Sequence, residues 1–186
     1  LRFLLANLAD FDVTKDAVPT EQWLEIDRYM LAHLRKLQDE ITGDYSRYEF
    51  HQVMQKLHHF CSEDLGGFYL DILKDRLYTG ATAGVPRRAA QSALYHIAHS
   101  LVRLFAPVLS FTSEEVWVNL TNNPADSVLL HAWHELPPQS DEAALMQRWQ
   151  QLRSIRSRVQ KVLEEARVKS EIGSSLAAEV TIQAGS

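Results

Sequence analysis

The sequence predicts an all-α protein, built as a largely antiparallel bundle of five to seven helices. Apolar residues recur every three or four positions in one segment after another, as in helices that bury one face. Residues that favour helix ends stand at the borders of these segments, among them Thr20, Gly43 and Pro86. Two short apolar stretches, Val128 to Trp133 and Val180 to Ile182, lack the helical spacing. We expect an extended segment across the bundle and a C-terminal strand there.

Composition is consistent with a single sizeable core. The chain has 186 residues, of which 46% are hydrophobic, and one cysteine, Cys61. No stretch reaches the roughly 20 apolar residues that a membrane span needs, so no membrane partner is expected. A lone cysteine excludes an internal disulfide framework and suits a reducing compartment. We therefore expect a cytoplasmic protein.

The first half of the chain is predicted to form four helices. The first spans Leu1 to Leu8 and has no capping residue before it, which indicates a piece excised from a longer protein. The second runs from Thr20 to about Ile41, and the third from about Tyr48 to Glu63. Gly66-Gly67 should separate the third helix from the fourth, at Glu63 to Thr79.

The second half is predicted to contain three more helices. One starts at Pro86 and ends near Phe105, because Pro107 cannot continue it. A short helix follows, and either Thr112 or Ser113 caps it. The longest helix should run from 141 to about 169. Its apolar stripe, expected to face inward, includes Leu145, Trp149, Leu152, Ile155, Val159, Val162, Leu163 and Ala166.

The helix at 63–79 carries the most informative pattern. Its polar face sets Lys74 and Tyr78 one turn apart, a pair suited to a phosphate and a base, although a solvated helix surface is the commoner origin of such a pair. Arg76 falls within the apolar arc, so it must either reach water over that surface or find a buried acceptor. Asp71 and Asp75 are better explained by an ion network with neighbouring cations than by an acid–base pair.

Charge is distributed unevenly along the chain. The net charge is −5, and residues 1–80 hold nine basic and fourteen acidic side chains, whereas residues 148–169 hold seven basic and two acidic. A local basic segment favours contact with nucleic acid, although a solvated amphipathic helix has the same composition. The candidate contacts are Arg2, Lys74, Tyr78, Arg153 and Arg156.

No catalytic or metal-binding motif is apparent. The sequence has no glycine-rich phosphate loop and no paired cysteine spacing, so no cofactor is expected in this chain. Histidines occur in groups, yet neighbours on one helix point in different directions, and the more distant pairs offer two ligands each. These groups are His58 and His59 with Cys61 and Glu63, His96 with His99, and His131 with His134.

Four blocks of the sequence resemble a known family. DLGGFYLDILKDRLYT, at 64–79, resembles a segment of the anticodon-binding domain of bacterial isoleucyl-tRNA synthetases. RFLLANL at 2–8, FAPVLSFTSEEVW at 105–117 and LEEARVKSEIGSSLAAEVTI at 163–182 follow the order of that family. The departure is Gly66-Gly67, where the family usually has small hydroxyl residues.

The resemblance implies a helical domain at 1–172, truncated at its N-terminus, that binds the anticodon stem-loop of tRNA(Ile). Residues 173–186 would begin a severed C-terminal junction domain. The whole enzyme, expected to be a monomer without a DNA partner, attaches isoleucine to this tRNA using ATP. The ATP-binding signatures and the zinc-binding cysteines of the family are absent here, so catalysis and editing belong elsewhere. The alternatives are a helical protein-interaction module without RNA binding and a small metalloenzyme built on the histidines.

Overall fold

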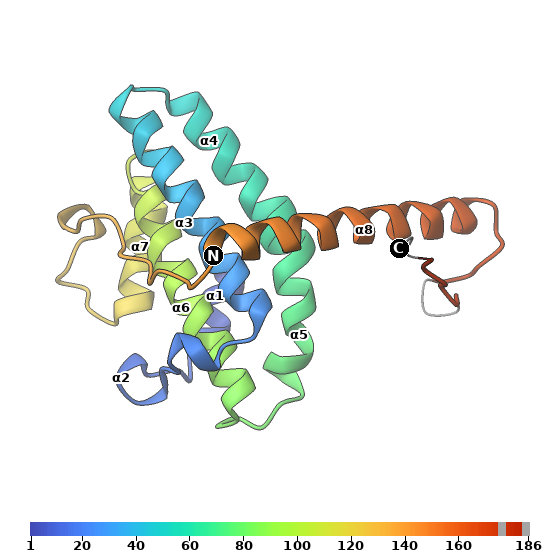
Figure 1. The fold of residues 1–186 in the computed structure, drawn as a ribbon. Coiled ribbons are helices and arrows are strands. Elements are labelled where there is room, and N and C mark those ends of the chain that lie inside the picture. Colours follow the sequence, from blue (N-terminus) through green and yellow to red (C-terminus); the bar gives the residue numbers. More distant parts are fainter. Residues whose placement is uncertain (175–177, 184–186) are drawn as a thin grey trace. The chain divides into compact units, whose positions relative to one another are not determined.

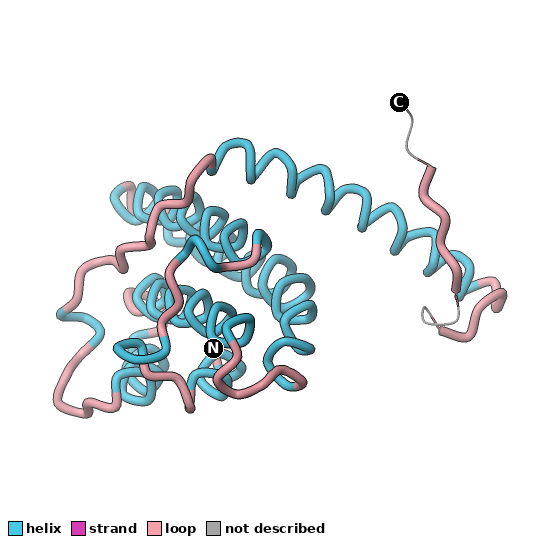
Figure 2. The backbone as a smooth tube through the Cα atoms, turned by 60° about the horizontal axis from the view of Figure 1, so that its bottom comes forward, coloured by secondary structure: helices cyan, strands magenta, loops and turns pink. Residues whose placement is uncertain are grey.

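The computed structural model describes residues 1–174 and 178–183, and its regular elements are helices (Figure 1). The chain divides into two compact units, Leu1–Glu142 and Ala143–Ser186. Figure 2 shows helices and loops, with no strand among the described residues. Within the same residues, none of the helices combines the length and the apolar character that crossing a membrane requires. The all-α prediction is confirmed, and the expected boundary at residues 172/173 stays a prediction.

Most of the helices belong to the first unit. Its α-helices are α1 (Arg2–Leu8), α2 (Val13–Asp16), α3 (Glu25–Ser46), α4 (Phe50–His59), α5 (Leu70–Tyr78), α6 (Val85–Phe105) and α7 (Ser110–Thr121). Two 3-10 turns, Thr20–Gln22 and Val128–Leu130, and a π-helix, η2 (Phe60–Tyr69), complete it. Helix α8 (Glu142–Val168) provides the helix of the second unit.

Helices α3 and α6 form the centre of the first unit. Their side chains Met30, Leu34, Leu94 and Leu101 are fully buried. Gln38 of α3 accepts a hydrogen bond from Ser100, and the hydroxyl of Tyr45 donates one to the carbonyl oxygen of Leu104, so the two helices run in the same direction. Helices α4 and α5 follow one another along the chain and run antiparallel to α3 and α6 (Figure 1).

The second predicted helix has different ends in the structure. Residues 20–22 form only a 3-10 turn, because Trp23 is extended and its indole N–H donates to the Val18 carbonyl oxygen at 2.7 Å. Helix α3 therefore begins at Glu25. It continues past Gly43 to Ser46, since a single glycine inside a helix costs only about 1 kcal/mol.

The glycine pair does not break the helix that contains it. Helices α4, η2 and α5 follow one another without interruption, so the predicted separation at Gly66-Gly67 is wrong. A Cβ atom added at Gly66 would lie 3.0 Å from the carbonyl oxygen of Cys61, five residues earlier, and one at Gly67 would lie 3.1 Å from that of Ser62. The wider π-helical turn brings these carbonyl groups close, and glycine fits there without a clash.

The two predicted extended stretches also differ. Val128–Leu130 is a 3-10 turn, because the Ser127 side chain caps the backbone N–H of Leu129. The segment after it, 131–139, is irregular, and it is tied to α3 by Gln38, whose amide donates to the His134 carbonyl oxygen at 2.8 Å. Val180–Ile182 is not in a strand, since it has no ladder partner among the described residues.

Candidate nucleic-acid interface

The outer face of α5 presents Lys74 and Tyr78 to solvent. Tyr78 is 64% exposed, and the Lys74 ammonium pairs with Asp71 Oδ1 at 2.8 Å. This hydrogen bond raises the pKa of Lys74, so its charge is secure at neutral pH. The Tyr78 hydroxyl accepts a weak hydrogen bond from Asn7 of α1 at 3.4 Å. The face therefore offers one cation and one aromatic ring, as the spacing predicts.

A buried ionic network holds α5 in place behind this face. Arg76 Nη1 donates to Asp27 Oδ2 at 2.8 Å, and the Tyr69 hydroxyl donates to Asp27 Oδ1 at 2.8 Å. Asp27 is fully buried, and burial raises the pKa of Tyr69 well above its usual range. Arg76 thus finds a buried acceptor, the second of the two arrangements that its position allows. Because Asp27 belongs to α3, the network fixes the rotation of α5 against the core.

Sequence reasoning missed Asp27, although a signal was present. Asp27 lies three, four and seven residues before Met30, Leu31 and Leu34, which places it on the buried stripe of α3. Arg76 is likewise a charge on a buried stripe. Two opposite charges that each violate an apolar pattern are candidates to pair with one another.

Arg2 lies exposed on α1, five residues before Asn7. Helix α1 is fixed by Gln91 of α6, whose side-chain amide donates to the Asn7 carbonyl oxygen at 2.8 Å and to the Asp10 carboxylate at 2.8 Å. Arg87 pairs with the same Asp10 carboxylate at 2.7 Å, and this hydrogen bond lowers the pKa of Asp10. Asn7 links α1 to both α6 and α5, so Arg2 and Tyr78 are carried by connected helices.

Arg153 and Arg156 belong to the second unit, on α8, and both are half-buried. Arg156 Nη1 donates to Gln160 on the next turn, at 3.3 Å. The stripe of α8 expected to face inward is exposed in part, notably at Leu152 and Val162. The inward orientation of this stripe stays a prediction.

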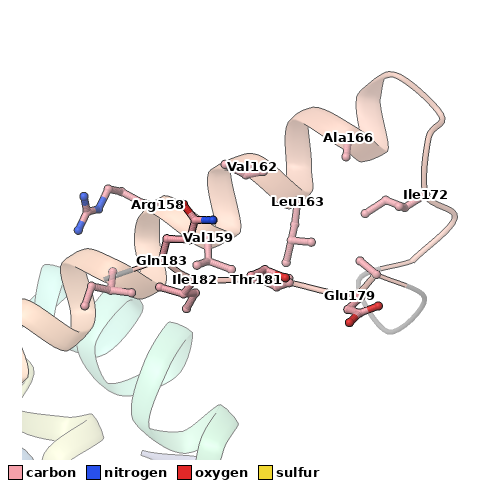
Figure 3. A pocket seen from close by; sticks show the side chains of 13 residues that line it. Arg158, Val159, Val162, Leu163, Ala166, Ile172, Glu179, Thr181, Ile182 and Gln183 are labelled. Atoms are coloured by element: carbon pink, nitrogen blue, oxygen red, sulfur yellow. The ribbon is translucent and has the colours of Figure 1, made fainter. Parts of the chain in front are cut away.

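The same helix borders an apolar groove of about 730 Å³. Figure 3 shows Val159 and Leu163 pointing from α8 toward the segment that carries Thr181 and Ile182. Val162, Val180 and Ile182 remain exposed around it, because the short segment 178–183 covers only a part of the helix. The lining of the groove is mainly apolar, and its polar side chains are Arg158, Glu179, Thr181 and Gln183.

The histidines form two groups in the first unit. His58 and His59 line a groove with His33 and Asp64, in which Asp64 Oδ2 lies 3.2 Å from His33 Nε2. His96 Nδ1 lies 2.9 Å from His134 Nε2, and the ring of His134 stacks on that of His99. Among residues 1–174 and 178–183, no three potential ligands converge on a metal position.

Burial keeps the second group of histidines neutral. It lowers the pKa of His96 to about 4 and that of His99 and His134 to about 3. His131 instead lies against Asp126, with its Nε2 at 2.8 Å from Oδ2. These residues join α6 to the irregular segment 131–139, so their observed role is packing. The sequence alone did not show that the two pairs meet.

The arrangement is that of a helical scaffold which exposes cations and an aromatic ring. The chain belongs to the family of the anticodon-binding domain of tRNA ligase, which matches residues 27–182. It is 65% identical over 188 residues to an isoleucine–tRNA ligase of Nitrosomonas europaea, covering 99% of this chain and 20% of that protein.

Further relatives agree. An isoleucine–tRNA ligase of Thiobacillus denitrificans is 59% identical over 184 residues, and one of an Azoarcus species is 55% identical over 183 residues. These matches cover 99% and 98% of this chain, and 20% of each relative. The chain thus corresponds to the anticodon-binding region of isoleucine–tRNA ligase, as the resemblance implied. It spans about one fifth of the length of the curated relatives it matches.

Proposed function

We propose that this chain binds the anticodon stem-loop of tRNA(Ile) on behalf of a ligase that attaches isoleucine to that tRNA using ATP. The observation that carries the proposal is the family match over 27–182, joined to the outward presentation of Lys74 and Tyr78 on α5. A cation that neutralises a phosphate and a ring on which a base stacks are the two contacts that unpaired RNA requires.

The contribution of the chain is to position the tRNA. Its helices make and break no covalent bond, and binding energy gained at the anticodon helps to place the distant acceptor end for reaction. We assign Arg2, Lys74 and Tyr78 to the anticodon loop, and Arg153 and Arg156 to the phosphate backbone. We propose no cofactor for this chain, with ATP and zinc bound in other parts of the enzyme.

The partner and the location follow from the same assignment. The tRNA is the only nucleic acid that we propose, with neither DNA nor a membrane as a partner. We place the parent enzyme in the cytoplasm as a monomer, where its lone cysteine in this region, Cys61, is half-buried and remains a thiol.

A titration with two tRNAs tests the proposal. The complete polypeptide that carries this chain is titrated with tRNA(Ile), and with the same tRNA in which the anticodon is replaced. We expect tighter binding of tRNA(Ile), and affinities for both that fall as salt rises, because phosphate contacts release counterions. Equal affinity for the two tRNAs would contradict anticodon recognition, and absence of binding to either would contradict the whole assignment.

A further inference from the structure

Four aromatic rings form a continuous row at one end of the first unit. The row consists of Tyr45 in the last turn of α3, Tyr48 in the turn that follows, Phe50 at the start of α4, and Trp133 of the segment 131–139. Ring centroids are 5.7 Å apart for Tyr45 and Trp133, 5.9 Å for Tyr45 and Phe50, and 6.2 Å for Tyr48 and Phe50. We call this set the aromatic row.

One ring of the aromatic row, that of Tyr45, is held in place, and the other three are exposed to solvent. Tyr45 is anchored by the hydrogen bond of its hydroxyl to the Leu104 carbonyl oxygen, at 2.7 Å, and burial raises its pKa to about 12. Trp133 stacks on it with an interplanar angle of 14°. Tyr48 is 80% exposed, Phe50 45% and Trp133 40%. Rings this exposed contribute little to the core, yet their positions are defined by a rigid neighbour.

The backbone at Tyr48 is held in a conformation that costs free energy. Its φ is 59°, in the left-handed region that bulky residues avoid. The N–H of Tyr48 donates to the Tyr45 carbonyl oxygen, and that of Glu49 donates to the Asp44 carbonyl oxygen. These two bonds make a Schellman motif, in which glycine or asparagine normally occupies the left-handed position. A tyrosine there is unfavourable for stability, and its side chain is directed into solvent.

Charges beside the row are already paired. Arg47 donates to Glu49 Oε2 at 3.0 Å and also pairs with Asp44, and Lys56 pairs with Asp44 at 2.7 Å. These cations reduce the repulsion that the carboxylates would exert on an RNA strand. Because Arg47 and Lys56 are engaged, the rings themselves are the main feature offered to a ligand. A ligand recognised here is one that stacks.

We propose that the aromatic row is a stacking platform for unpaired bases of tRNA, in addition to the contacts on α5. The inference rests on the proposed function, which supplies an RNA partner. Bases stack on aromatic side chains with little dependence on their identity, and an exposed, rigidly supported ring is what such stacking requires. Tyr48, at the end of the row and its most exposed ring, is the main contact, and the strain in its backbone is retained because the ring serves binding.

Replacing Tyr48 separates binding from stability. In the complete polypeptide, Tyr48→Gly should weaken the affinity for a tRNA(Ile) transcript by about tenfold, the size of one lost stacking contact. The same change should raise the temperature at which the domain formed by this chain unfolds, because glycine adopts the left-handed conformation without strain. The slope of log affinity against log salt should stay unchanged, since no phosphate contact is lost. Tyr48→Phe keeps the ring and should keep the affinity.

The matched control is Phe111→Ala, which removes a ring that is 93% exposed but lies outside the row; it should leave affinity unchanged. Unchanged affinity in Tyr48→Gly would overturn the inference and leave a protein partner as the occupant. A fall in Tm together with a fall in affinity would also overturn it, since the ring would then be structural. In both cases the wild type still binds tRNA. If the wild type fails to bind, the proposed function fails, and the platform fails with it.

Discussion

Two ion pairs on the same helix, α5, differ in burial and therefore in what they can do. The Arg76–Asp27 pair has side chains that are 16% and 0% exposed, whereas those of the Lys74–Asp71 pair are 56% and 57% exposed. Both pairs join a cation to a carboxylate at hydrogen-bond distance. Water competes with the exposed pair only, so Lys74 can exchange its partner for a phosphate while Arg76 cannot. One helix thus combines a buried face, whose ion pair is fixed, with an exposed face, whose cation can change its partner.

The largest expected effect comes from breaking the buried pair. Asp27→Ala leaves the Arg76 charge and the Tyr69 hydroxyl buried without their acceptor. We expect a loss of about 3 to 5 kcal/mol in the free energy of unfolding, measured by urea denaturation. Asp71→Ala is the matched control on the exposed pair and should leave the urea midpoint nearly unchanged. A similar loss in both variants would remove the distinction between the two faces.

Acidification tests the buried histidines of the same unit. The pKa values of His96, His99 and His134 lie below the ordinary value of 6.5 in the folded state. The unfolded chain therefore binds more protons as pH falls below about 6.5, and stability declines from there toward pH 4. Between pH 7 and 5, Tm should fall, and His134→Gln should make that fall shallower. An identical pH dependence in the two proteins would contradict the assignment of these shifts.

Removing the exposed cation should affect binding without affecting the fold. Lys74→Ala in the complete polypeptide should weaken tRNA(Ile) binding and lower the slope of log affinity against log salt by about 0.7 to 0.9, the value for one phosphate. The urea midpoint should stay at its wild-type value. If the slope does not change, Lys74 makes no phosphate contact.

The smallest effect is expected from releasing Lys74 from its intramolecular partner. Asp71→Asn removes the carboxylate that holds the ammonium at 2.8 Å, and it also removes a negative charge from the binding face. Affinity for tRNA(Ile) should rise by roughly twofold, as measured by filter binding at low salt. A weakened affinity would show that Asp71 itself contacts the RNA.

Local rules predict much of the fold. Helical spacing and end signals found each main helix, and the misplaced charge of Arg76 indicated a buried acceptor. Helix ends were less accurate where tertiary contacts decide them. Trp23 delays the start of α3 through a side-chain hydrogen bond, and the carbonyl groups opposite Gly66-Gly67 make glycine a favourable residue inside a π-helix. Neither effect can be recognised from a short stretch of the sequence alone.

The candidate site was predicted only as residue types. Lys74 and Tyr78 share the exposed face that the spacing indicated, because a helix docked by one face determines its opposite face. The contacts that hold this helix come from other elements: Asp27 of α3 binds Arg76, and Asn7 of α1 binds Tyr78. Likewise the meeting of His96 with His134 depends on the path of an irregular segment. Contacts between distant segments depend on how the helices pack. The spacing of apolar residues along the sequence does not specify that packing.

The most direct test of the division between the inner and outer faces of α5 is the double variant Lys74→Ala/Tyr78→Ala, made in the complete polypeptide. Its affinity for tRNA(Ile) and its urea midpoint are measured side by side with the wild type. We expect a fall in affinity of tenfold or more, on the order of one cation and one stacking contact, with an unchanged midpoint. Wild-type affinity in a folded double variant would contradict this expectation.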